Sequence, residues 1–187
     1  MRVTRALVPK WLNATQQVGV RMAEDGRIAG RLARENAYRR LLMDLDDALG
    51  DEHDLVANMA LTVSVVFHGL PYLNWVGFYR CRDGELVIGP FQGQRAKVRI
   101  PMGNGACGKV ALKKRTIVVE DVHRFPGLVS WAPGCASEIV LPLVKHGRLF
   151  AVLELDSPVP SRFEQVDQDG LEALIKEFIQ RTDVEAR

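Results

Sequence analysis

Apolar residues recur at helical spacing in the first third of the chain and again at its end. The apolar positions of residues 38–49 predict a helix that ends at Gly50. A second helix is expected over residues 55–68, with Asp54 as its N-cap. Residues 160–181 close the chain with an amphipathic helical pattern. Helices therefore bracket the middle of the chain.

The middle of the chain has the pattern of short strands separated by turns. Residues 74–81 have the pattern of a strand whose successive side chains lie on opposite faces, and Asp83-Gly84 predicts a hairpin turn. Further strands are expected at 85–92, 97–101 and 116–121, with a short helix at 107–114 and a long loop at 122–136. A last hairpin is predicted over residues 137–158. This order predicts an α+β fold, with about six strands in one central antiparallel sheet flanked by helices.

The last hairpin carries acids in strands that should be buried. Glu138 opens its first strand, and Glu154 and Asp156 lie two residues apart on one face of the second. Burying a carboxylate is costly unless it meets a cation or several donors. The three acids therefore suggest a site for a positively charged group. The alternative interpretation is that these strand ends are solvated.

Two aromatic residues share one face of the first predicted strand. Trp75 and Tyr79 lie two pleats apart, where they would form two walls of a small pocket. Aromatic rings near acids suit a ligand with an ammonium or a polarised sulfur group. The alternative is that both rings belong to an ordinary core.

Composition describes an ordinary globular protein with a basic amino-terminal segment. The chain has 187 residues, 47% of them hydrophobic and 26% charged, with a formal net charge of +2. Residues 1–36 are expected to form a basic helical extension and residues 37–182 the main domain. No apolar run approaches the roughly 20 residues that cross a bilayer, and no signal peptide is recognisable. A cytoplasmic protein that binds neither membrane nor nucleic acid is expected.

Three cysteines are too few and too widely spaced for a disulfide scaffold or a zinc site, and no metal is expected. Cys107 follows a glycine-rich turn at a predicted helix N-terminus, which should lower its pKa. Cys135 lies in the long loop and is the second candidate for reactivity. Cys81 lies on a strand and is expected to pack. For each cysteine, an incidental buried thiol is the alternative.

Six segments together resemble the free methionine-(R)-sulfoxide reductase family, a branch of the GAF-domain superfamily. The resemblance covers about residues 38–178. It implies a GAF-like fold, a homodimer and a pocket that encloses one free amino acid. The segments, in chain order, are NWVGFYR, GPFQG, VRIP-x-G-x-G-x-CG, DVH-x-FPG, SEIVLPL and LELDSPVPSRF.

The resemblance assigns roles to the aromatic and acidic residues. Trp75 and Tyr79 match the family's aromatic pocket residues. Glu138 and Asp156 match acids that hold the ligand's amino end and act near the sulfoxide. Glu154 stands where the family usually has aspartate, so its carboxylate should reach further into the pocket by more than about an ångström.

The resemblance also shows where the catalytic thiols differ. The family uses a thiolate to attack the sulfoxide sulfur, then forms a disulfide that thioredoxin reduces, without a bound cofactor. The family's nucleophile position, in the long loop, is Trp131 here, and a second cysteine position is Lys97. Only Cys107 is retained, and Trp131 is expected to occupy the mouth of the pocket.

Three functions follow from these residues. The first is a domain that binds a small zwitterion such as methionine sulfoxide but has degenerate catalysis. The second is an active reductase in which Cys135 is the nucleophile and Cys107 the resolving thiol, with thioredoxin as reductant. The third is an interaction scaffold, in which residues 1–35 recruit a partner.

Overall fold

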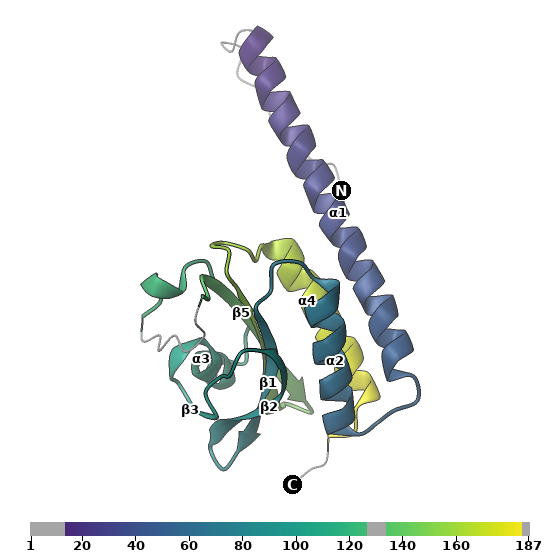
Figure 1. Ribbon diagram of the computed structural model, residues 1–187, viewed down its shortest axis with the longest axis vertical. Helices are drawn as coiled ribbons and strands as arrows, with labels where there is room; N and C mark the ends of the chain where they lie inside the picture. Colours follow the sequence, from purple (N-terminus) through teal and green to yellow (C-terminus); the bar gives the residue numbers. More distant parts are fainter. Residues whose placement is uncertain (1–13, 127–133, 185–187) are drawn as a thin grey trace.

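The computed structural model describes residues 14–126 and 134–184, with side chains from residue 29 onward. Over these residues the chain forms one sheet with helices on both of its faces (Figure 1). The elements in chain order are α1 (Ala14–Leu49), α2 (Leu55–Gly69), β1 (Trp75–Arg82), β2 (Glu85–Gly93), β3 (Arg99–Pro101), α3 (Gly105–Lys113), β4 (Ile117–Val119), the 3-10 turn η1 (Val122–Arg124), β5 (Ser137–Lys145), β6 (Arg148–Ser157) and α4 (Gln165–Arg181).

The sheet has six strands in the order β3-β2-β1-β6-β5-β4, and all neighbours are antiparallel. Two hairpins, β1-β2 and β5-β6, meet at the centre through the β1-β6 pair. The β5-β6 turn is formed by His146 and Gly147, both with positive φ (52° and 75°), as a two-residue hairpin turn requires. The predicted α+β class and the six-stranded antiparallel sheet are confirmed.

Alternation along the strands divides the interior into two cores. Val76 and Phe78 of β1 face α1, α2 and α4 and belong to the larger core. Trp75 and Tyr79 face the opposite side, where α3 covers β5 and β6. Figure 1 shows α2 and α4 on one side of the sheet and α3 on the other. The second core is the one that contains the candidate site.

The long helix α1 crosses the boundary that the sequence predicts at residue 36. Its 36 residues span about 54 Å, and its first part projects beyond the rest of the protein (Figure 1). Its later part packs on the core through Tyr38, Leu41 and Leu45. The division into residues 1–36 and 37–182 stays a prediction, because one continuous helix joins the two parts.

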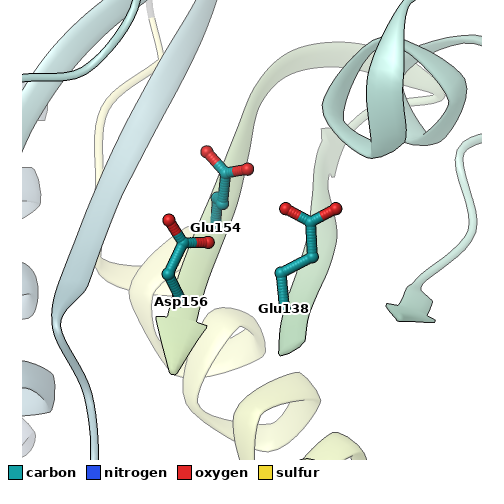
Figure 2. A group of neighbouring side chains, drawn as sticks. All are labelled: Glu138, Glu154 and Asp156. Carbon is teal, nitrogen blue, oxygen red and sulfur yellow. The ribbon is translucent and has the colours of Figure 1, made fainter. Parts of the chain in front are cut away.

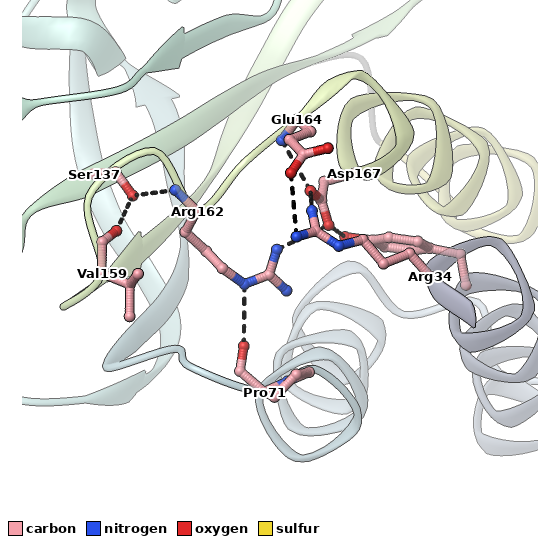
Figure 3. Close-up of polar contacts among 8 residues, drawn as sticks. Arg34, Pro71, Ser137, Val159, Arg162, Glu164 and Asp167 are labelled. Carbon is pink, nitrogen blue, oxygen red and sulfur yellow. Dashed lines mark hydrogen bonds and ion pairs between the residues drawn. The ribbon is translucent and has the colours of Figure 1, made fainter. Parts of the chain in front are cut away.

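A buried carboxylate ties α1 to α4. Asp167 accepts hydrogen bonds from Arg34 Nη1 at 3.0 Å, Arg162 Nη1 at 2.9 Å and the Tyr38 hydroxyl at 2.9 Å (Figure 3). It also accepts from the backbone N–H of Glu164 at 2.9 Å, which completes a capping box at the start of α4. Asp167 is fully buried, and its four bonds join α1 to the start of α4, two parts of the chain that are distant in sequence.

Asp54 caps α2 as the sequence predicts. Its Oδ1 accepts from the N–H groups of Val56 at 2.9 Å and Ala57 at 2.8 Å. Within the described part of the chain, no helix has the length and apolar character needed to cross a membrane.

Candidate ligand-binding site

The register of three central strands places the candidate residues in one row. Trp75 of β1 lies opposite Asp156 of β6, and Asp156 lies opposite Glu138 of β5. Directly paired residues have Cβ atoms about 5 Å apart, so these three side chains are neighbours. One pleat further along, Glu154 pairs with Gly77 on one side and Val140 on the other. Residues from three separate sequence motifs thus share one face.

Three carboxyl groups converge on this face. One oxygen from each of Glu138, Glu154 and Asp156 lies within 4.8 Å of the others, and Figure 2 shows all three side chains projecting from the same side of β5 and β6. Glu138 and Asp156 are 6% and 5% exposed. Glu154 keeps some accessible surface, but its carboxyl group is enclosed by protein atoms. We call these three residues the carboxylate cluster; its members do not face bulk water.

The site contains buried polar atoms without a partner in the described part of the chain. They are Glu138 Oε1, Asp156 Oδ1 and the indole Nε1 of Trp75, which lie in the same row. Leaving a buried polar atom unpaired costs about 1 to 3 kcal/mol. Two unsatisfied acceptors beside an unsatisfied donor indicate a ligand that carries both a cation and an acceptor.

Burial raises the pKa of all three acids of the carboxylate cluster, which favours their protonated forms. Burial raises the pKa of Asp156 to about 8, and the Glu138 carboxylate adds to the increase. Burial is also the main cause that raises the pKa of Glu154 well above its usual range, with the charges of Asp156 and Glu138 adding to it. Burial raises the pKa of Glu138. A cationic group placed here would replace those protons.

The aromatic residues form one continuous surface beside the acids. The rings of Trp75 and Tyr79 stack with centroids 5.9 Å apart and planes at 30°, so they contact each other. Phe91 of β2, which the sequence analysis missed, stacks on Trp75 at 5.8 Å. Gly77 makes room for the indole, since a Cβ there would lie 2.4 Å from the Trp75 ring. The hydroxyl of Tyr79 donates to the Lys97 carbonyl at 3.0 Å.

Both candidate thiols contact the carboxylate cluster. Cys107, in the first turn of α3, is buried and hydrogen-bonds with Glu154. Cys135, just before β5, is buried, and its thiol hydrogen-bonds with Asp156 and lies 3.4 Å from the Ser137 carbonyl. The two cysteines flank the same three acids. Sequence reasoning named both thiols but gave no sign of these contacts.

The thiols are held protonated in the ligand-free site. Burial raises the pKa of Cys107 well above its usual value, and Glu154 and Glu138 raise it further. The prediction that the helix N-terminus lowers the Cys107 pKa is therefore wrong, because burial and the neighbouring acids outweigh the helix dipole. Burial and the charge of Asp156 likewise raise the pKa of Cys135. Cys81 is half-buried on β1, where burial raises its pKa too.

The predicted nucleophile position is outside the described residues. Trp131 falls in the segment 127–133, so its expected place at the mouth of a pocket stays a prediction. Lys97 lies in the connection between β2 and β3, next to the site through its carbonyl contact with Tyr79.

The chemistry of the cluster fits a cation, and two kinds of cation are relevant. Three carboxylate oxygens within 4.8 Å of one another could ligate a divalent metal ion. A metal ion, however, offers no acceptor to the unpaired indole N–H of Trp75. A ligand with an ammonium group and an oxygen acceptor would pair with the acids through the ammonium and with the Trp75 indole N–H through the oxygen. The expectation of no metal stays a prediction.

The fold and this site define a GAF-domain protein. The GAF domain family matches residues 33–180, which is most of the chain. The match includes α2, the whole sheet and all the residues of the carboxylate cluster. It thus contains the complete candidate site.

Similar proteins show to which branch of the GAF-domain superfamily the chain belongs. Protein YtsP of Bacillus subtilis is 43% identical over 140 residues, covering 74% of this chain and 86% of the relative. The free methionine-R-sulfoxide reductase of Escherichia coli is 39% identical over 141 residues, covering 75% and 86%. The X-ray structure of the Neisseria meningitidis free methionine-R-sulfoxide reductase in complex with its substrate has a TM-score of 0.74 and 39% identity, covering 77% and 87%. The chain belongs to the free methionine-(R)-sulfoxide reductase family of GAF-domain proteins.

Proposed function

We propose that the chain binds a free amino acid whose side chain carries an oxidised sulfur, with L-methionine-(R)-sulfoxide as the representative ligand. The observation that carries this proposal is the row of unpaired atoms: Glu138 Oε1 and Asp156 Oδ1 beside the indole N–H of Trp75. The ammonium group pairs with the acids, and a ligand oxygen accepts from the indole. The Neisseria relative was solved with its substrate, which supports the choice of ligand.

The aromatic surface supports a ligand whose side chain contains sulfur. Sulfur groups pack favourably against aromatic rings, with about 0.3 to 1.5 kcal/mol per contact. Trp75, Tyr79 and Phe91 supply such rings in mutual contact next to the acids. The burial of Glu138 and Asp156 also counts against the scaffold hypothesis, in which these acids would face water.

Calorimetric titration tests the proposal with three ligands: L-methionine-(R)-sulfoxide, its (S) epimer and L-methionine. The (R) epimer should bind most tightly, and Asp156→Asn should weaken its binding about tenfold or more, because a charge-assisted bond to the ammonium is lost. Glu120→Gln removes an exposed acid outside the site and is the matched control. If none of the three ligands binds, the ligand assignment is wrong.

Slow or absent turnover is the second part of the proposal. Thiolate is the attacking form, and both Cys107 and Cys135 have raised pKa values in the ligand-free site. Trp131 occupies the position of the family's nucleophile and cannot displace oxygen from sulfur. Catalysis through the family's usual thiol is therefore lost.

A reductase with relocated thiols is the second candidate function. It is favoured by the contacts of Cys135 with Asp156 and of Cys107 with Glu154, which place both thiols beside the proposed ligand site. Cys135 thiolate would take the sulfoxide oxygen as a sulfenic acid, releasing methionine. Cys107 would then form the disulfide and release water, and a thioredoxin dithiol would restore both thiols. Glu154, whose pKa burial raises well above its usual range, is placed to donate a proton to the sulfoxide oxygen.

A thioredoxin-coupled NADPH assay separates the two functions. A relocated reductase should lose its turnover in Cys135→Ser and in Cys107→Ser, while Cys81→Ser, the matched control on β1, should keep it. Turnover in wild type that survives Cys135→Ser would exclude Cys135 as nucleophile. Absence of turnover in a wild type that binds the (R) epimer would support the binding function. A homodimer, a cytoplasmic location and the lack of a bound cofactor are further parts of this proposal.

A further inference from the structure

A second cavity lies at the opposite end of the central strands from the carboxylate cluster. It has a volume of about 620 Å³ and is lined by the start of α2, the end of β1, the β5-β6 turn and the segment after α4. Trp75 and Arg80 are five residues apart on β1, about 17 Å along the strand. The cavity is therefore separate from the proposed amino acid site.

Arginines dominate the charged lining of this cavity. Arg80 and Arg82 come from the end of β1, and Arg148 from the start of β6. In the part of the chain that the structure describes, none of the three forms an ion pair. Nε of Arg80 is buried and has no hydrogen-bond partner there. A buried guanidinium N–H without an acceptor indicates a missing anionic partner.

The remaining charged groups of the lining do not neutralise the arginines. Lys145 adds a further cation, which donates to the Thr182 carbonyl at 2.7 Å. Asp54 lines the cavity, but its Oδ1 is engaged in capping α2. Asp183 is the other acid, and it makes no ion pair among the described residues. Four cations thus face two carboxylates.

We propose that this cavity binds a phosphate group, either as the free anion or at the end of a small phosphorylated molecule. Guanidinium groups bind phosphate oxygens through paired N–H donors, and three arginines at one cavity supply more donors than a single carboxylate accepts. Phe150 and Leu149 line the same cavity and offer an apolar surface to the rest of such a molecule.

Calorimetric titration at low ionic strength tests this site with inorganic phosphate, pyrophosphate, AMP and succinate. Phosphate and pyrophosphate should bind at one site and more tightly than succinate, which carries carboxylates only. Tighter binding of AMP than of phosphate would identify a phosphorylated molecule, and equal or weaker binding the free anion. Arg80→Gln and Arg148→Gln should each weaken phosphate binding about tenfold or more. Arg148 is exposed at the start of β6, so this variant tests the site even if Arg80→Gln folds poorly.

Arg40→Gln on α1 is the matched control, because it removes one exposed positive charge outside the cavity. It should bind phosphate like wild type. The proposal is overturned if wild type shows no saturable binding at phosphate concentrations up to about 10 mM. Titration to this concentration would detect even a dissociation constant of a few millimolar. It is also overturned if Arg40→Gln weakens binding as much as Arg148→Gln, or if succinate binds as tightly as phosphate.

Discussion

Asp156 is a buried carboxyl group with a second acid opposite it and a third two residues away. Its folded pKa of about 8 lies above its ordinary value, so the folded protein binds a proton that the unfolded chain releases. The ligand-free fold is therefore most stable below the unfolded pKa. That stability is lost as the pH rises from about 4 to about 8.

Asp156→Asn should remove this part of the pH dependence. At pH 7 the variant should be more stable than wild type by roughly 2 to 4 kcal/mol, because it no longer has to bury or protonate a carboxyl group. Urea unfolding of both proteins at pH 5, 6, 7 and 8 measures the difference. A stability difference that stays constant over this range would contradict the raised pKa.

At the residue scale, the sequence identified the acids, the aromatic residues and the two cysteines. Acids in a buried strand are visible from the sequence pattern alone, because residues such as Glu154 interrupt an apolar run. Phe91 was missed because it lies on β2 and reaches Trp75 only through strand pairing. The raised thiol pKa values were missed because they depend on burial and on neighbours far along the chain.

At the scale of elements, the first central strand positions the site through one small residue. Gly77 lies between Trp75 and Tyr79 on the same face, and the indole ring occupies the space above it. Alternation predicted which residues share this face. It could not predict that the two rings touch, since the Trp75 rotamer depends on the space that Gly77 leaves.

Gly77→Ala should displace the indole and weaken the site. The new Cβ would lie 2.4 Å from the Trp75 ring, so we expect about 1 to 3 kcal/mol of destabilisation and weaker binding of methionine sulfoxide. Gly30→Ala, in an open position on α1, is the control and should be neutral or slightly stabilising. Unchanged stability and affinity in Gly77→Ala would show that Trp75 is not held in this way.

At the scale of the whole molecule, Asp167 joins α1 to the domain. Charge composition predicted a basic helical extension up to residue 36. In the structure α1 continues to Leu49, and Arg34 reaches Asp167 across 133 positions. Such a long-range pairing leaves no local pattern in the sequence. The fold class was predictable from the order of elements, whereas the junction with α1 was not.

Asp167→Ala should be strongly destabilising. It leaves the guanidinium of Arg162 and the hydroxyl of Tyr38 without their buried partner, which costs about 3 to 5 kcal/mol. Asp169→Ala, at an exposed position whose side chain accepts a hydrogen bond from Gln165, should change stability by less than about 0.5 kcal/mol. Thermal and urea unfolding measure both. Equal effects of the two substitutions would contradict the role given to Asp167.

The central claim is that the carboxylate cluster recognises the ammonium group of a free amino acid. Calorimetric titration of L-methionine-(R)-sulfoxide against its N-acetyl derivative tests it most directly, since acetylation removes the positive charge and keeps the sulfoxide. The free amino acid should bind at one site, with affinity that rises between pH 6 and pH 8 as Asp156 loses its proton, and the N-acetyl form should bind at least about a hundredfold more weakly. Equal affinity for the two ligands would contradict the account.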